Sequence, residues 1–181
     1  MNETFSCIAY EAGTYGFCVQ ARDGSEAEFN ISINAPGTWK GNVSSDWHDP
    51  ANWAGFVVPD ADTDVFIPAG RPKNPTVTSG SAWCHSLEIG QGATLNAWQD
   101  VNANFGLDCA GGIALADEFI ELDISSGHVV WQSGASFDAS ANTVVRVGGN
   151  WTVESGTDIS PGAGTVIFDG YETSSITNHD N

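Results

Sequence analysis

The sequence has few basic residues and no long apolar run. Its 23 Asp and Glu residues face only 5 Lys and Arg residues, which gives a formal net charge of −18, and the basic residues form no cluster. Because basic clusters are what bind phosphates, we expect neither nucleic acid nor an anionic membrane surface as a partner. No window approaches the roughly 18 apolar residues of a membrane-spanning helix, so we expect no insertion into a membrane.

A leader segment and a helical pattern are also missing. No basic segment followed by an apolar run opens the chain, and Met1 is compatible with a fragment of a longer secreted precursor. Apolar residues do not recur at helical spacing, because the short apolar runs alternate with period two and end at Gly, Asn, Asp or Pro. We therefore predict an all-β protein.

The abundant residues are typical of an extracellular β-protein. The 181 residues are 41% hydrophobic and include 7 Trp and 9 Phe, which is enough apolar area for one domain with a real core. The 21 Gly, the 4 Cys and the acidic balance favour a secreted β-protein over a cytosolic enzyme. We predict an extracellular or cell-surface location.

The N-terminal segment, residues 1–36, reads as a few strands. We expect strands near 5–10, 15–21 and 28–34, with a turn at 22–25. An immunoglobulin-like domain takes roughly 100 residues, so this segment is either the last strands of such a module or a β-extension. Pro36 and Gly37 mark its boundary, since both residue types interrupt strand pairing.

A repeat is the strongest signal in the chain. Four nine-residue segments align without a gap, and each reads apolar, any residue, apolar, two turn-like residues, Gly, two more residues and apolar. Their glycines are Gly92, Gly112, Gly134 and Gly156, at steps of 20, 22 and 22 residues. Such a period is that of one coil of a β-solenoid, in which each coil buries its apolar face against the next.

In this interpretation two columns of inward side chains run along the solenoid. One contains Ile89, Cys109, Trp131 and Val153, and the other contains Leu95, Leu115, Phe137 and Ile159. A β-sandwich with an accidental spacing is the alternative, because strands flanked by Gly occur there as well. We favour the solenoid, since four segments keep the same register.

Residues 37–75 differ from the repeats in composition. They contain Trp39, Trp47 and Trp53, many Asp and Asn, and five prolines. The open end of a solenoid exposes apolar side chains and unpaired strand edges. We therefore predict that 37–75 form a cap and that 76–181 form the coils.

Several ordered motifs resemble the solenoid regions of very large bacterial cell-surface proteins. The segments that resemble the start of these solenoid regions are 39–47 (WKGNVSSDW), Asn52-Trp53, Val58-Pro59 and 64–68 (DVFIP). The same segments are similar, more loosely, to an eight-glycine domain. Their first and later coils are similar to four further segments: 84–89, 92–95, 148–152 and 164–170.

The resemblance implies a right-handed parallel β-helix from a multidomain protein that is exported by the type IX secretion system. Such proteins serve as adhesins or as stalks of surface polysaccharide-active enzymes. Two segments, 102–106 and 117–126, depart from the family pattern, and residues 117–126 have the character of an insertion. The C-terminal sorting domain of the family has no counterpart in the sequence, so the chain resembles a truncated solenoid.

The four cysteines suggest at least one disulfide. Cys7 and Cys18 flank a Gly-containing turn at 12–14, and a hairpin there would bring them together. The remaining pair is Cys84 with Cys109. The repeat places Cys109 level with Ile89, about 16 Å along a strand from Cys84. That separation is too long for a disulfide unless the chain bends at Cys84, so a bridge and a buried free Cys109 both stay open.

The candidate binding residues each have a structural alternative. Asp60, Asp62 and Asp64 alternate as in the first half of a calcium loop, but the glycine and the later glutamate of such a loop are missing. We favour a solvated turn and expect no cofactor, with Ca²⁺ the one metal these carboxylates suit. Trp47, Trp53, Trp83 and Trp98 are candidates for stacking on a sugar ring, and we favour core packing of the cap and of the coil ends.

No catalytic constellation is evident, so we predict that the chain is not an enzyme. Its four His are scattered, and Arg146 is the only basic residue in the aligned coils. We expect a structural or adhesive module of a large surface protein, whose partners are neighbouring domains, other copies of itself or glycans.

Two alternatives remain for the function. One is an extracellular filament, in which the coil after Gly170 accepts N-terminal strands of another copy. The other is a carbohydrate-binding or catalytic fragment of a polysaccharide-active enzyme, for which polyanionic glycans are poor ligands at this net charge.

Overall fold

The computed structural model describes the backbone of 13–20 and 26–33 and, with side chains, residues 35–116, 119–139, 142–160, 162–170 and 174–179. Strands β1 (Gly13–Gln20) and β2 (Glu26–Ile33) form an antiparallel hairpin in which Phe17 pairs with Phe29. Two of the three predicted N-terminal strands are thereby confirmed, and the third, near 5–10, lies outside the described residues. The predicted turn at 12–14 is wrong, because Gly13 begins β1.

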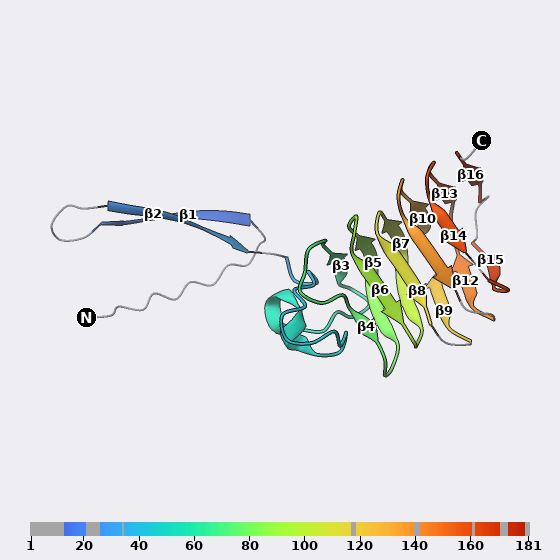
Figure 1. Cartoon of the computed structure of the whole chain (residues 1–181), viewed down its shortest axis with the longest axis horizontal. Coiled ribbons are helices and arrows are strands. Elements are labelled where there is room, and N and C mark those ends of the chain that lie inside the picture. Colours follow the sequence, from blue (N-terminus) through green and yellow to red (C-terminus); the bar gives the residue numbers. More distant parts are fainter. Residues whose placement is uncertain are drawn as a thin grey trace.

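All other strands belong to two parallel sheets that lie side by side along one axis (Figure 1). Their bounds are β3 Asp64–Ile67, β4 Thr76–Val77, β5 Ala82–Ile89, β6 Thr94–Ala97, β7 Val101–Cys109, β8 Gly112–Leu115, β9 Glu121–Ile124, β10 His128–Trp131, β11 Ser136–Ala139, β12 Val144–Val147, β13 Trp151–Val153, β14 Asp158–Ser160, β15 Thr165–Phe168 and β16 Ile176–Asn178. The helical content of the described chain is two single 3-10 turns, η1 (Pro50–Asn52) and η2 (Ala54–Phe56), so none of its helices is long enough to cross a membrane.

The sheets wrap around three faces of a solenoid. On the first face lie β9, β12, β15 and the beginnings of β5 and β7; on the second lie β3, the ends of β5 and β7, β10, β13 and β16; on the third lie β4, β6, β8, β11 and β14. Because β5 and β7 continue around a corner, the first two faces count as one sheet. The predicted all-β parallel solenoid is confirmed, with about 5 turns.

The stretch 117–126, interpreted as an insertion, contains a regular strand of the solenoid. Within it, β9 pairs in parallel with β12, and Leu122 lies opposite Val145. The family pattern missed β9 because the preceding coils carry their first-face residues inside the longer strands β5 and β7. The second coil consists of two strands, β7 and β8, whereas the third coil consists of three strands, β9, β10 and β11.

The first predicted column of inward residues is confirmed. Ile89 pairs with Cys109, Cys109 with Trp131, and Trp131 with Val153, and all four side chains are buried. Parallel register thus places one residue of each coil directly above its counterpart in the previous coil. The interior of the solenoid is a continuous dry core.

The second predicted column is wrong at one position. Leu95 pairs with Ile113, and Ile113 with Phe137, whereas Leu115 pairs with Ala97 and Ala139. The cause is the corner of the second coil, which runs from Cys109 to Gly112 and is two residues shorter than the alignment without gaps assumed. A slip of two residues keeps each side chain on the same face of a strand, so Leu115 is buried as well.

The short corner depends on a glycine that the repeat did not single out. Gly92, Gly134 and Gly156 have φ near +82° and turn their corners as expected, but Gly112 lies inside β8. The tight position is Gly111, where a Cβ atom would lie 2.4 Å from the carbonyl oxygen of Ala93. Only glycine fits that position without displacing the neighbouring coil.

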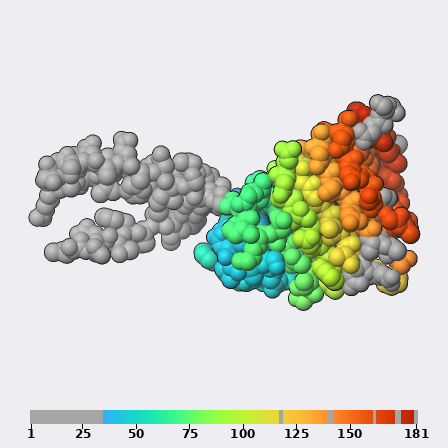
Figure 2. All heavy atoms as spheres, viewed as in Figure 1, coloured from blue at the N-terminus to red at the C-terminus, as the bar shows by residue number. Residues whose placement is uncertain are grey.

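The Trp-rich segment closes the N-terminal end of the solenoid (Figure 2). Trp39, Trp47 and Trp53 are fully buried, and the ring of Trp53 makes edge-on contacts with the other two at 4.9 and 4.7 Å. The segment 37–75 is not a separate unit, since its β3 pairs in register with β5. The first coil therefore begins inside the predicted cap.

Candidate functional site

Two of the four tryptophans proposed for sugar stacking are buried, whereas Trp83 and Trp98 are 47% and 48% exposed. Trp47 and Trp53 are both 0% exposed. The indole N–H of Trp53 donates to the carbonyl oxygen of Trp47 at 2.6 Å, which satisfies its polar atom inside the cap. The assignment of Trp47 and Trp53 to carbohydrate binding is therefore wrong, because aromatic burial within the cap removes both rings from solvent.

A buried asparagine, which sequence reasoning did not single out, organises the cap. Asn52 donates from Nδ2 to Ser44 Oγ at 2.8 Å and to the carbonyl oxygen of Asp46 at 3.0 Å. Its Oδ1 accepts from the N–H groups of Val43 and Ser44 at 3.1 and 2.9 Å. The side chain thus uses its donors and its acceptor to fix the loop 43–46 over Trp47.

The cysteines that lie in the described side chains are not bridged. Cys84 and Cys109 are both free and buried, and the register places Cys84 beside Ala103 rather than beside Cys109. Burial, aided at Cys84 by the charge of Asp64, raises the pKa of both thiols to about 12. The Cys84–Cys109 bridge is therefore absent, and the alternative of a buried free Cys109 is confirmed. The side chains of Cys7 and Cys18 lie outside the described residues, so their bridge stays a prediction.

The alternating carboxylates of 60–64 serve local turns. Asp60 accepts from the Thr63 hydroxyl at 2.7 Å and from the Asp62 N–H at 3.2 Å, and these bonds lower the pKa of the Asp60 carboxyl. Asp64 points elsewhere, toward β5. In the part of the chain that the structure describes, no group of three or more His, Cys, Asp or Glu side chains is arranged to hold a metal. Ca²⁺ binding by Asp60, Asp62 and Asp64 stays a prediction without geometric support.

Asp64 instead holds a histidine on the second face. Its Oδ1 lies 2.8 Å from His85 Nδ1 and accepts from the Ser86 hydroxyl at 2.5 Å. The Ser86 bond, followed by the His85 bond, lowers the pKa of the Asp64 carboxyl. Serine and histidine both bond to the carboxylate and not to each other, so the three residues do not form the relay of a serine hydrolase.

The ring of His85 stacks on an exposed phenylalanine. The centroids of His85 and Phe105 lie 4.3 Å apart with an interplanar angle of 24°, and 58% of Phe105 is exposed. A bulge produces this contact, because the register jumps from Cys84–Ala103 to Ser86–Gly106 and gives β7 one extra residue. Bulges re-aim side chains in this way next to binding sites.

A hollow of about 280 Å³ lies beside Phe105 on the outer surface of β5, β7 and β10. The outward positions of the second face form a row in register, Asp64, Ser86, Gly106 and His128. Gly106 leaves a gap in this row since it has no side chain. The gap forms the floor of the hollow, and Phe105 forms part of its wall.

Polar groups surround the hollow. Glu88 and Asp108 lie next to it in the neighbouring row, and Gln132 Nε2 donates to Asp108 at 2.5 Å. Nδ1 of His128 accepts from the Asn150 N–H at 2.8 Å, so neutral His128 carries its proton on Nε2. The lining of the hollow therefore includes an aromatic ring, two carboxylates and a histidine.

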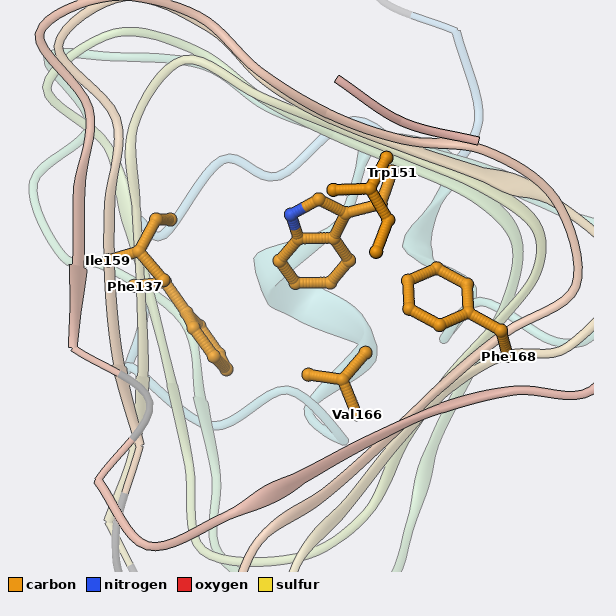
Figure 3. A pocket seen from close by; sticks show the side chains of 6 residues that line it. Phe137, Trp151, Ile159, Val166 and Phe168 are labelled. Carbon is orange, nitrogen blue, oxygen red and sulfur yellow. The ribbon is translucent and has the colours of Figure 1, made fainter. Parts of the chain in front are cut away.

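The opposite end from the cap is apolar and open. Phe137, Trp151, Ile159, Val166 and Phe168 converge on a pocket of about 180 Å³ (Figure 3). Ile176 also lines this pocket. Val166 and Phe168 are each 37% exposed, whereas Val145 and Val147, one coil earlier, are buried. Among the described residues, β14, β15 and β16 are the last strands of their rows.

The comparisons with known proteins leave the function open. A family model described as a domain of unknown function, DUF8693, matches residues 38–110, which comprise the cap and the strands from β3 to β7. No curated protein and no solved structure matches the chain. The resemblance to surface adhesins exported by the type IX system therefore stays a prediction.

Proposed function

We propose that the chain is a non-enzymatic structural and adhesive module of an extracellular protein. The observation that carries this proposal is the continuous parallel stack, in which one apolar core and in-register coils extend away from the Trp-rich cap. Such a stack positions loops and outer faces at a fixed distance from an attachment point, as solenoids generally do. The acidic composition, at a net charge of −18, supports an extracellular location.

Ion pairs on the first face strengthen the stack between coils. Arg146 on β12 bonds to Glu121 on β9 and, at 3.1 Å, to Asp169 after β15. These bonds, led by the bond to Glu121, raise the pKa of Arg146, which therefore keeps its charge. One basic side chain thus links three successive coils, as a rod that resists extension would require.

Antibody labelling of intact source cells tests the proposed location. We expect an antibody raised against the solenoid to label the outside of intact cells in immunogold micrographs. Lysed cells provide the control for epitope accessibility. Labelling that appears only after lysis would contradict the proposal, because an adhesive module must face the medium.

Self-association is a second candidate function, supported by the open end. The apolar pocket and the last strands offer both side-chain contacts and edges for strand addition. We propose the hairpin β1–β2 of a second copy as the occupant. Strands β1 and β2 pair with each other, so each has a second edge with which it could pair with another strand. Each is 8 residues long, the same length as β5, a strand that spans two faces of the solenoid. Repetition of this head-to-tail contact would give a filament.

Light scattering on mixtures of two variants tests the head-to-tail contact. Ile176→Asp places a charge on the open end, where Ile176 is 67% exposed, and Phe17→Asp alters the hairpin. We expect the unaltered chain to grow in mass with concentration, each variant alone to stay monomeric, and their mixture to stop at dimers. Val43→Asp, at the exposed cap, is the matched control and should associate like the unaltered chain. An unaltered chain that stays monomeric at high concentration and high salt would contradict this proposal.

A further inference from the structure

The outer hollow has the features of a binding site. Asp64, which the sequence singled out, does not line it but holds His85, which stacks on Phe105. It lies on three successive coils, so it is roughly 10 Å wide along the solenoid axis at the usual strand spacing. Its wall and floor, Phe105 and Gly106, come from the bulged part of β7. The pairing of β7 with β5 on one side and with β10 on the other fixes its shape.

Phe105 is held in place before any ligand arrives. Its ring stacks on His85, and His85 is fixed by the 2.8 Å bond to Asp64. An exposed aromatic ring that is rigidly supported costs little entropy on binding. One face of the pair is therefore a prepared platform for a flat apolar surface.

The polar groups around the hollow offer hydrogen-bond acceptors to the hydroxyls of a ligand. Asp64 already accepts from Ser86 and lies beside His85, and Asp108 already accepts from Gln132. These bonds stabilise the charged form of each carboxylate and occupy some of its lone pairs, and the remaining lone pairs can accept hydrogen bonds from a ligand. His128 also lines the hollow.

We propose that this hollow binds a neutral sugar ring. The apolar face of a pyranose would lie against Phe105, over the floor at Gly106, and its hydroxyls would donate to Glu88 and Asp108 and accept from His128. The net charge of −18 disfavours polyanionic glycans at the same place. The proposal rests on the adhesive part of the proposed function and names the ligand class of that surface.

Two substitutions test the hollow without disturbing the core. Phe105→Ala removes the platform. Gly106→Val fills the floor, where a Cβ atom would meet only the carbonyl oxygen of His128 at 3.6 Å, an ordinary contact. Phe119→Ala is the matched control, because Phe119 is 77% exposed in the turn before β9, away from the hollow. Circular dichroism and melting curves would verify that all three variants keep the fold.

The measurement is calorimetric titration with cellohexaose, maltohexaose, xylohexaose and mannohexaose, at low and high salt. We expect at least one of these neutral probes to bind, with an affinity independent of salt. Phe105→Ala should weaken that binding at least tenfold, Gly106→Val should abolish it, and Phe119→Ala should leave it unchanged.

Three results would overturn the proposal. The first is that none of the probes binds. The second is that a probe binds and that Phe105→Ala and Gly106→Val both leave this binding intact. The third is that the hollow binds only a cationic probe such as spermine, with an affinity that salt lowers. Since immunogold labelling does not depend on sugar, failure of the hollow and failure of the proposed surface location are distinguishable.

Discussion

At the scale of single residues, the cap depends on polar atoms as much as on its three tryptophans. Aromatic rings exclude water without fixing one arrangement of the loop around them, whereas Asn52 joins four backbone and side-chain groups of 43–46. The Asn52 side chain is fully buried and the groups that it bonds are partly shielded, so water replaces these bonds only in part. Asn52 thus determines how the loop covers the end of the core.

Asn52→Ala should therefore destabilise the protein strongly. The change leaves the N–H groups of Val43 and Ser44 and the carbonyl oxygen of Asp46 without these partners, at roughly 1–3 kcal/mol for each buried group that stays unsatisfied. We expect a loss of about 3 kcal/mol or more in the free energy of unfolding by urea denaturation. Asn74→Ala is the control, because exposed Asn74 makes one 3.3 Å bond to the Thr94 N–H and should cost less than about 1 kcal/mol. Equal losses in the two variants would contradict the role of Asn52.

The buried thiols predict both slow labelling and a pH effect. In a Cys7→Ser, Cys18→Ser background, Cys84 and Cys109 should not react with Ellman's reagent at pH 8 until guanidinium unfolds the chain, because their pKa of about 12 keeps them protonated. The ordinary thiol pKa of 9.0 applies in the unfolded chain, which therefore ionises first. Stability should be lost as the pH rises from about 9 to about 12. Rapid reaction of either thiol in the folded protein would contradict its burial.

At the scale of elements, corners rather than strands determine the register between coils. The strands alternate buried and outward residues, so a shift by two residues leaves the same faces buried. The number of residues in the corner decides between such registers. In the second coil the short corner at Ala110 and Gly111 places Ile113, and not Leu115, over Leu95.

Gly111→Ala and Gly106→Ala separate a tight corner from an open position. A Cβ atom at Gly111 would lie 2.4 Å from the Ala93 carbonyl oxygen and 2.5 Å from that of Gly90, so the backbone must shift. We expect Gly111→Ala to cost roughly 1–3 kcal/mol, the usual penalty for overpacking, in chemical denaturation. Gly106→Ala has room and should be neutral or slightly stabilising. A Gly111→Ala variant as stable as Gly106→Ala would show that the corner is looser than described.

At the scale of the whole molecule, the solenoid was predictable while its surface was not. The column of Ile89, Cys109, Trp131 and Val153 follows from a period of about 21 residues, because coils bury equivalent positions. The hollow could not be inferred in this way. It arises from a bulge opposite His85 and from a missing side chain at Gly106, and neither feature repeats from coil to coil.

Two of the four candidate tryptophans, Trp47 and Trp53, failed for a related physical reason. Residue type alone does not distinguish a ring that closes the core from a ring that faces solvent, and Trp47 and Trp53 close the core. Phe105 had no signal beyond its place in a segment that departed from the family pattern. That departure marks the bulge, so irregular segments of a repeat are where binding residues should be sought.

Backbone nuclear Overhauser effects between coils are the most direct test of the stacked solenoid. We predict interstrand contacts that connect Ile89 with Cys109, Cys109 with Trp131 and Trp131 with Val153, together with contacts between Leu95 and Ile113. Contacts between Leu95 and Leu115 instead would contradict the short corner. If the four residues of the first column showed no contacts with one another, the stacked coils themselves would be wrong.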